Sequence, residues 1–273
     1  MPSGQQLLTP LEAHWFFGCP VLGPDAVELL ADAMPILAGR CGGRLPALLL
    51  GGMLPQSRTA REVLVRFESA FDIYLAGESV VGAASLEGGL DGFLGRRSAN
   101  LRSKMRKAFR KAAGQGVSFE RCCPVDGAEA DALYARMLAV EQRSWKGLGH
   151  CGMAESPARE FYGDMLRRLA VRGTARLMFA RHEEQDIGFI FGGMFGAIYR
   201  GQQFSYDAGW RAFSIGNLLQ VEQIRWLCEE GATRYDMGSA SGEAMAYKVH
   251  WAEQERPIQT WLLRPRSLRP RAL

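Results

Sequence analysis

Long apolar runs and export signals are missing from this 273-residue sequence. No stretch approaches the roughly 18 consecutive apolar residues that a membrane-spanning helix requires. The N-terminal MPSGQQLLTPLEAHW lacks the charged and then apolar pattern of a secretory signal. We therefore expect a cytoplasmic protein with no membrane span. Since 47% of the residues are hydrophobic, the chain has enough apolar material for one large core or two modest ones.

Closely spaced cysteine pairs and clusters of histidines are also missing from the sequence. The six cysteines show no CxxC spacing, and a chain of this length does not need disulfides to fold. The four histidines are scattered, and none pairs with a cysteine or carboxylate at a spacing typical of metal ligands. Internal repeats and long low-complexity linkers are absent as well. We expect free thiols, no metal and a globular fold.

Acidic residues are absent between Asp91 and Glu120, although this segment holds eight of the basic residues. Because the net charge of the chain is +4, all other residues together carry a net charge of −4. Ser98 as a cap and Gly114 as a stop predict a helix over about 98–113 with a narrow apolar stripe. Its charged faces suit either simple solvation or an anionic partner, such as a phosphopantetheine carrier protein, an acidic peptide or RNA. The basic residues are Arg96, Arg97, Arg102, Lys104, Arg106, Lys107, Arg110 and Lys111.

Hydrophobic periodicity divides most of the chain into strands and helices. Short connections after residues 181 and 195 favour antiparallel hairpins, and a helix between 206 and 233 favours a parallel crossover. The fold class predicted is α/β (α+β), with a mixed, mostly antiparallel central sheet flanked by helices. Strands are expected at 47–53, 70–76, 117–122, 175–181, 187–195, 198–206, 233–237 and 258–263. Helices are expected at 25–37, with an early end at Pro35, and at 98–113, 126–147, 156–173 and 217–230.

The segment from Tyr199 to Trp251 is the most informative part of the sequence. A strand ends near Gly209, a short loop follows, and a helix begins close to Gly216. The first turn of a helix offers unpaired amides and the positive end of the helix dipole, which suits a phosphate or pyrophosphate. Glycine would let a ligand approach the backbone at that point.

Residues from about Leu90 to Leu263 resemble the GNAT acyltransferases, in the branch related to FemAB-type, BioF2-like and CelD-like proteins. RAFSIG is similar to the family's [QR]xxGx[GA] loop, whose amides hold the pyrophosphate of coenzyme A, with Ser214 at a glycine position. SWKGLG and YDMGSASGEAMAYKVHW resemble two further signatures of this branch. The resemblance implies donor-binding residues at Phe204, Ser205, Tyr206, Arg211, Ser214, Ile215, Gly216, Asn217 and Leu218.

The same resemblance implies a GNAT fold preceded by a reduced GNAT-like half. Residues 1–90 would form that half, 91–116 a basic linking helix, and 117–273 the catalytic domain.

The resemblance also implies roles for residues near the end of the segment. Tyr247 is expected to protonate the departing thiolate, and Lys248 to stabilise the oxyanion. Glu141 and His250 are candidates for the base, since a histidine pKa of about 6.5 suits proton transfer. Each has an ordinary alternative: a core aromatic, a surface lysine, a solvent-facing glutamate or a structural histidine.

Acceptor binding is assigned to four further residues. Trp145 and Lys146 belong to SWKGLG, at the end of a helix that borders the acceptor groove in this branch. Asp207 and Asp236 sit at strand ends, where a carboxylate would either bind an ammonium group or cap a loop.

Together, these expectations predict an N-acyltransferase. It would move an acyl group, from acetyl to fatty acyl, from acyl-CoA or an acyl-phosphopantetheine carrier protein to an amine of a peptide, amino acid or sugar. No metal is expected, and an acidic carrier protein could dock at the basic helix. Two alternatives stay open: a FemAB-like aminoacyl-tRNA-dependent transferase, with the basic helix on phosphates, and a non-catalytic GNAT-like module that binds peptide or nucleic acid.

Overall fold

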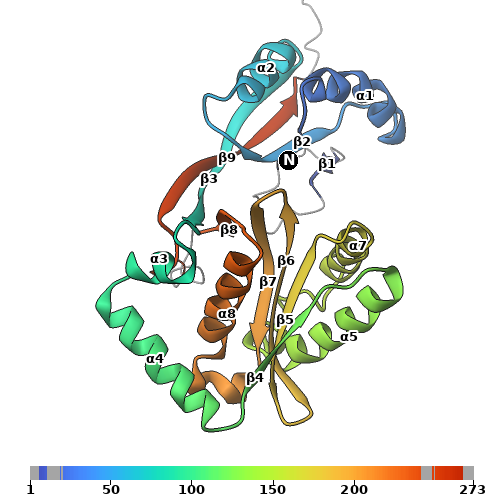
Figure 1. Ribbon diagram of the computed structural model, residues 1–273. Coiled ribbons are helices and arrows are strands. Elements are labelled where there is room, and N and C mark those ends of the chain that lie inside the picture. The colour runs from blue at the N-terminus through green and yellow to red at the C-terminus, as the bar shows by residue number, and fades with distance from the viewer. Residues whose placement is uncertain (1–5, 11–18, 20, 241–247, 249, 267–273) are drawn as a thin grey trace, which may run out of the picture. The chain divides into compact units, whose positions relative to one another are not determined.

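The computed structural model describes residues 6–10, 19, 21–240, 248 and 250–266. The chain divides into two compact units (Figure 1). The first combines residues 1–81, 239–243 and 255–273, and the second combines residues 82–238 and 244–254. Residues 255–273 thus belong with the N-terminal unit rather than with the catalytic domain expected from the sequence, because strand β9 (Gln254–Pro265) pairs with β2 (Ala47–Met53).

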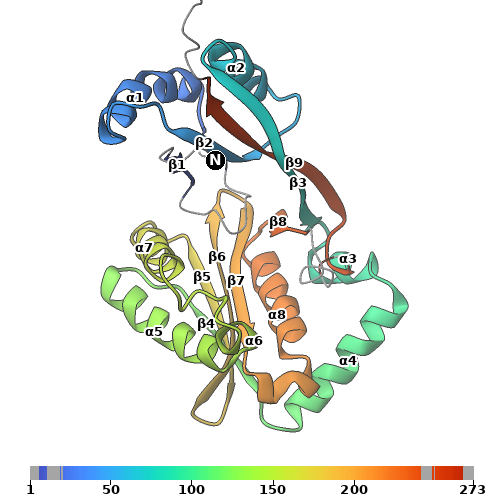
Figure 2. The same ribbon diagram turned by 180° about the vertical axis from the view of Figure 1, so that it is seen from behind.

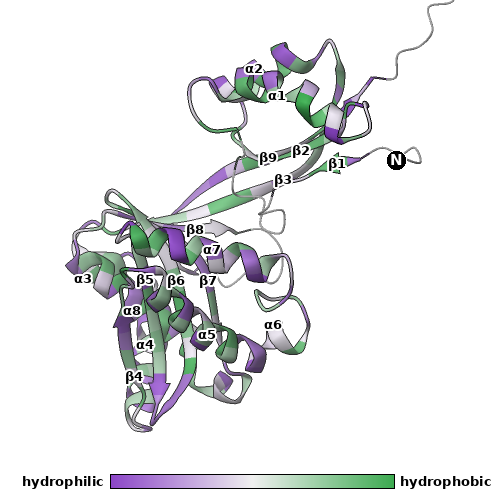
Figure 3. Ribbon diagram, turned by 90° about the vertical axis from the view of Figure 1, so that its right-hand side faces the viewer, coloured by the Kyte–Doolittle hydropathy of each residue, from purple (hydrophilic) through white to green (hydrophobic). Residues whose placement is uncertain are grey.

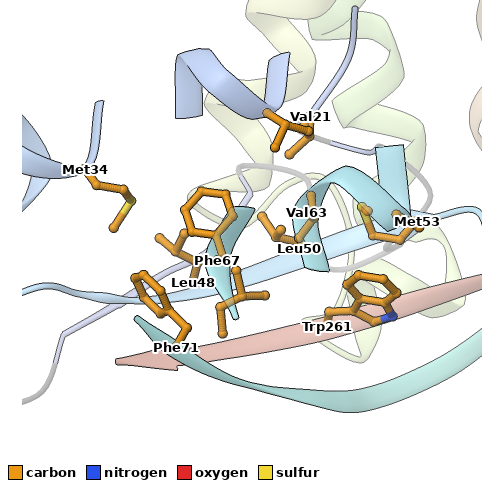
Figure 4. Packing of buried hydrophobic residues seen from close by; sticks show 12 residues of the cluster. Val21, Met34, Leu48, Leu50, Met53, Val63, Phe67, Phe71 and Trp261 are labelled. Carbon is orange, nitrogen blue, oxygen red and sulfur yellow. The ribbon is translucent and has the colours of Figure 1, made fainter. Parts of the chain in front are cut away.

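The first unit is a small sheet with two helices. Its strands follow the order β1-β2-β9-β3, with β1 parallel to β2 and β2 antiparallel to β9. Phe67, Phe71 and Trp261 are among the buried residues that form its core (Figure 4). The remaining elements are β1 (Leu7–Leu8), α1 (Ala26–Arg40), α2 (Arg58–Phe67) and β3 (Phe71–Ser85), whose last residues belong to the second unit.

Helix α1 corrects one expectation, because it continues through Pro35 to Arg40. A proline inside a helix removes one backbone hydrogen bond and strains the preceding turn. Val27 and Met34 on this helix are buried in the core of the first unit, with Leu37 packed against it. This burial on both sides of Pro35 offsets the local cost.

The second unit is a sheet with the strand order β8-β7-β6-β5-β4. Neighbouring strands from β4 to β7 are antiparallel, and β7 pairs with β8 in parallel. The predicted fold class and the parallel crossover are therefore confirmed. The elements are α3 (Gly89–Gly95), α4 (Ala99–Ala113), β4 (Ser118–Cys122), α5 (Gly127–Arg143), α6 (Trp145–Leu148), α7 (Ala158–Val171), β5 (Ala175–His182), β6 (Gln185–Phe195), β7 (Ile198–Tyr206), the 3-10 helix η1 (Ala208–Phe213), α8 (Ile215–Glu229) and β8 (Arg234–Ser239).

Helices cover both faces of this sheet. Figure 2 places α5 and α7 over one face, and Figure 1 places α8 over the other, with α4 beside it. Along α5 and α7, hydrophilic and hydrophobic stretches alternate (Figure 3), as expected of helices with one buried side. Leu166 of α7 and Leu219 of α8 are both fully buried.

Side-chain caps begin α4 and α5, and α5 ends earlier than the sequence predicted. Ser98 Oγ accepts from the Leu101 amide at 3.2 Å, and Asp126 Oδ1 accepts from the Glu129 amide at 2.9 Å, as N-caps do. The helix expected to reach residue 147 instead ends at Arg143. There the backbone of Ser144 is extended and its hydroxyl caps α6, a separate turn.

Strand β7 contains a bulge that the sequence did not predict. Gly192 of β6 lies opposite Gly201, whereas Phe191 lies opposite Gln203, so Gln202 is an extra residue on β7. A Cβ on Gly192 would lie 2.1 Å from the Arg200 carbonyl oxygen, so only glycine fits beside the bulge. A bulge bends a strand and increases its twist.

Candidate active site

The bulge divides β7 into two parts with different neighbours. Within the described residues, β8 pairs with β7 only at Ile198, Tyr199 and Arg200, which we call the paired segment. Residues 201–206, the separated segment, continue alongside β6. The bulge therefore stands where the two parallel strands part, and the separated segment keeps an edge free of ladder partners from β8.

Lys146 of α6 occupies that free edge. Its ammonium donates to Gln203 Oε1 and to the Phe204 carbonyl oxygen, both at 2.9 Å. The residue is only 8% exposed, and no carboxylate of the described chain lies within ion-pair distance of it. Burial lowers the pKa of Lys146, and the charge of Glu141 opposes this shift only in part. Lys146 is therefore a buried amine on neutral oxygen acceptors.

Gln203 connects Lys146 to α7. While its oxygen accepts from Lys146, its Nε2 donates to the Tyr162 hydroxyl oxygen at 2.8 Å. Both Gln203 and Tyr162 are buried. This chain of hydrogen bonds fixes the side-chain amide and, through it, the direction of the lysine.

Lys248 brings a second amine close to the first. Its Nζ donates to the Met237 carbonyl oxygen at 2.7 Å. Burial lowers the pKa of Lys248 to about 8, and the positive charges of Lys146 and Arg200 contribute to the shift. Asp236 opposes it, but this carboxylate is already paired with Arg200 at 2.9 Å. Lys248 therefore has a lower pKa than an ordinary lysine, and its role at the oxyanion stays a prediction.

Glu141 lies fully buried beneath the turn that follows α5. Its Oε1 accepts from the Met153 amide at 3.0 Å, and its Oε2 has no hydrogen-bond partner among the described residues. A Cβ on Gly152 would lie 2.2 Å from Oε1, so the chain closes tightly around this carboxylate. The charge of Glu141 acts on Lys146, whose pKa it raises, and the role of Glu141 as a base stays a prediction.

The segment between β7 and α8, expected from the sequence to be a short loop, forms the 3-10 helix η1. Ser214 adopts the left-handed conformation with φ 57°, which confirms that the chain here takes a shape favoured by glycine. Its carbonyl oxygen accepts from the amides of Asn217 and Leu218. In the described structure, the amides of Ile215 and Gly216 have no backbone partner.

Gly216 allows close packing at the start of α8. A Cβ at this position would lie 3.0 Å from Tyr206 Cε1 and 3.1 Å from Phe204 Cε2. The glycine therefore lets the start of α8 rest against the rings of the separated segment. On the same segment, the buried Ser205 hydroxyl and Gln202 Oε1 have no partner among the described residues. A buried polar atom without a partner is costly, which marks a position where a ligand could supply one.

Other residues named from the sequence are placed differently. Tyr247 lies outside the described residues. His250 is exposed, and Trp145 is 53% exposed, so neither is enclosed with the two lysines. Arg211 is exposed on η1.

The two aspartates proposed to bind an acceptor both have internal partners. Asp207 caps η1 through the Gly209 amide at 2.9 Å and accepts from Arg143 Nε at 2.7 Å. Asp236 accepts from Arg200 and from the Gly238 amide. The loop-capping alternative therefore describes their observed contacts.

Sequence reasoning missed Gln203, Tyr162 and Arg200. Gln203 is 57 positions from Lys146, so no local spacing connects them. The one available signal was the run of polar residues in YRGQQFSY, within a strand that is otherwise central and covered.

Parallel strands that part beside a helix N-terminus, with two lysines at the opening, form the candidate site. Comparison with protein families identifies an acetyltransferase (GNAT) domain over residues 96–249, which is more than half of the chain. The chain belongs to this GNAT family. Comparison with curated proteins gives no match.

Solved structures share the fold at low sequence identity. FemX matches with a TM-score of 0.57 and 12% identity, over 86% of this chain and 76% of its own. L-PGS from Bacillus licheniformis gives 0.56 and 14%, over 89% and 75%. A tandem GNAT protein from the clavulanic acid biosynthesis pathway gives 0.52 and 12%, over 90% and 71%. The FemAB-related character of the fold is thereby confirmed.

No helix in the described part of the chain is long and apolar enough to cross a membrane. Among the same residues, no group of three or more histidine, cysteine or acidic side chains could hold a metal ion.

Proposed function

We propose that this protein is an N-acyltransferase that moves an acyl group from a thioester donor to an amine. The observation that carries the proposal is the pair of buried amines, Lys146 and Lys248, where β7 and β8 part. Lys146 is aimed at the free edge of the separated segment by Gln203. Amines with lowered pKa values are suited to acyl transfer, because they can stabilise negative charge or move a proton near neutral pH.

The reaction forms one C–N bond and breaks one C–S bond. The neutral amine of the acceptor attacks the thioester carbonyl, whose oxygen gains negative charge, and collapse of the tetrahedral intermediate expels the thiolate. We assign the oxyanion to the ammonium of Lys248, where a preorganised charge is most effective because the site is buried. The proton lost by the acceptor ends on the thiolate, and Tyr247 stays the predicted donor for that step.

Electrostatics favours a plain acyl group over an aminoacyl group. An aminoacyl donor carries an ammonium next to the reacting carbonyl, which would add a positive charge close to Lys146, Lys248 and Arg200. Two like charges 4 Å apart repel by about 4 kcal/mol at an effective dielectric constant of 20. Of the acids nearby, Asp236 is already paired with Arg200, and Glu141 is fully buried with one of its two oxygens on the Met153 amide.

The donor arm would lie along the separated segment. The strand no longer pairs with β8 here, and the Ser205 hydroxyl has no partner among the described residues. Both features suit the amide-rich pantetheine chain, since added strands and extended ligands bind sheets through main-chain hydrogen bonds. The free amides of Ile215 and Gly216 would take the adjoining phosphate. The residues present therefore fit an acyl-pantetheine donor, in coenzyme A or on a carrier protein.

Thiol release tests this proposal directly. The purified chain would be incubated with acetyl-, octanoyl- and palmitoyl-CoA, with and without a panel of amines that includes peptides, amino acids and amino sugars. Release of free thiol that depends on the amine, with the N-acyl product seen by mass spectrometry, supports it. Transfer of an amino acid from aminoacyl-tRNA, with every acyl thioester inert, would replace it with the aminoacyl alternative.

A further inference from the structure

A strip of unneutralised positive charge runs along α4, outside the site described above. Lys104, Arg106, Lys107 and Arg110 are exposed, and none has an ion-pair or hydrogen-bond partner among the described residues. Some basic side chains elsewhere on the same unit are compensated: Arg136 binds both Glu120 and Asp186, for example. On α4, four neighbouring charges on one helix have no carboxylate partner in the described part of the chain.

The helical spacing sorts these charges into two rows. Residues three or four apart share a face of a helix, so Lys104, Lys107 and Lys111 form one row. Arg102, Arg106 and Arg110 form the other, although Arg102 is used internally, donating to the carbonyl oxygens of residues 94, 95 and 97. Like charges four apart destabilise a helix by a few tenths of a kcal/mol per pair. A partner of opposite charge would turn this cost into attraction.

The lysine row leads to the donor loop. Lys111 Nζ donates to the Ala212 carbonyl oxygen at 3.0 Å and lies 4.4 Å from the centre of the Phe213 ring. Both of those residues belong to η1, directly before Ser214 and the start of α8 (Figure 1). From Lys111 to Lys104 the row extends about 10 Å along the helix axis. Anything bound along α4 therefore has the donor loop at one end.

The size of the strip and its composition select a partner. The lysine row begins beside the loop that would take the phosphate of coenzyme A and continues along α4 away from it. A macromolecule bound at the loop can contact the whole row. Single-stranded RNA is usually held by aromatic side chains that stack on its bases. The one aromatic residue of α4, Phe109, instead packs against Phe119 at 6.4 Å. The charge of α4 suits an acidic protein surface, and among anionic macromolecules an acyl carrier protein also brings the thioester that the proposed function requires.

We propose that α4 is the docking surface for an acidic carrier protein, which delivers the acyl group on a phosphopantetheine arm past η1 to the separated segment of β7. The inference rests on the proposed function and names its donor. The transfer has the same balance as before: the carrier thioester loses its acyl group to the amine and is released as the free carrier thiol.

The test compares two donors that carry the same acyl group. Octanoyl-loaded bacterial acyl carrier protein and octanoyl-CoA would each be assayed with the unmodified chain, with the double variant Lys104→Glu/Lys107→Glu, and with Arg168→Glu/Arg172→Glu. The last pair makes the same charge change at exposed positions at the end of α7, away from α4. Circular dichroism would confirm that all three fold alike.

The α4 variant is expected to raise KM for the octanoyl carrier about tenfold and to leave KM for octanoyl-CoA within about twofold. For the unmodified chain, kcat/KM with the carrier should fall steeply as salt is raised. The α7 variant should match the unmodified chain with both donors.

Four outcomes would overturn the inference while the proposed function survives. In the first two, the α4 variant loses activity equally with both donors or with neither donor. In the third, the octanoyl carrier is inert while octanoyl-CoA is a substrate. In the fourth, the unmodified chain binds RNA, the α4 variant does not, and activity with the carrier is unchanged by the variant. If neither thioester is a substrate, it is the proposed function that fails.

Discussion

The two parts of β7 show how one strand serves two purposes. The paired segment is a structural ladder: Tyr199 is fully buried, its ring packs on Tyr235 at 5.1 Å, and Arg200 is locked to Asp236. The separated segment presents Gln203 and the Phe204 carbonyl oxygen to a lysine. The difference arises from the loss of the β8 ladder, since both parts pair with β6. Under the proposed function, the chemistry would therefore lie where the strand keeps one neighbour and loses the other.

The largest expected effect is a loss of catalysis when the lysine that contacts the separated segment is replaced. Lys146→Met should lower kcat by about 100-fold or more, the range seen when a preorganised donor is removed from a reacting centre. The free energy of unfolding should stay equal or increase, because burying an amine costs more than burying a thioether. Steady-state thiol release and urea unfolding measure the two quantities.

Arg168→Met on α7 is the matched control, with a charge removed from an exposed position. Full activity in Lys146→Met would show that the amine at the free edge takes no part in the reaction.

The second-largest expected effect is a loss of stability from a substitution beside the bulge, at the boundary between the paired and separated segments. In Gly192→Ala the new Cβ would lie 2.1 Å from the Arg200 carbonyl oxygen and 2.6 Å from Tyr199 Cζ. Overpacking of this kind costs about 1–3 kcal/mol. Gly127→Ala is the comparison, since a Cβ there meets nothing within 4 Å. Equal midpoints of urea unfolding for the two variants would contradict a bulge held by Gly192.

The pH dependence of activity sharpens the role assigned to Lys248. Because its pKa is lowered to about 8, its ammonium is lost as pH rises through that value. If the ammonium stabilises the oxyanion, kcat should decline above about pH 8, and Lys248→Arg should remove the decline, since arginine stays charged. A decline that persists unchanged in the arginine variant would assign the titration to another group.

The same pKa shift predicts how stability changes with pH. In the folded state the pKa lies below the ordinary value of 10.5, so the unfolded chain binds more protons between about pH 8 and 10.5. The contribution of Lys248 to the free energy of unfolding is therefore unfavourable below pH 8 and improves as pH rises through this window. Lys248→Met should lose that rise in urea unfolding experiments.

The smallest effect concerns the turn after the separated segment. Ser214→Gly should raise the free energy of unfolding by less than about 1 kcal/mol, because the relief of a left-handed φ is partly offset by the greater freedom of glycine in the unfolded chain. Ser214→Ala keeps the strain and removes only the hydroxyl. If the alanine and glycine variants are equally stable, the backbone at Ser214 is not strained.

The sequence predicted the strands and helices of the second unit well, because their signals are local. The capping residues Ser98 and Asp126, for example, act on amides three positions away. The resemblance also named Lys146 and Lys248. These features depend on spacing along the chain, which a single sequence contains.

What the sequence could not predict depends on distant partners. The bulge at Gln202 is defined by register against β6, and the requirement for Gly192 follows from the Arg200 carbonyl oxygen across the ladder. The hydrogen bonds from Lys146 through Gln203 to Tyr162 join α6, β7 and α7. Placement of β9 in the first unit likewise follows from pairing with β2, some 200 positions earlier in the chain.

One extra residue at Gln202 also changes the parity of β7. Side chains on a strand alternate between its two faces, so an insertion of one exchanges odd and even positions for everything that follows. Gln203 lies on the face that an uninterrupted strand would give to its neighbour in sequence. Deleting Gln202 would leave Gln203 opposite Phe191 and remove only the bulge. Straightening the strand with Gln202 kept in the ladder would instead turn the Gln203 amide away from Tyr162 and exchange the faces of Phe204 and Ser205. The register at the bulge therefore decides which side chains this part of β7 presents, without a change in the chemistry of any of them.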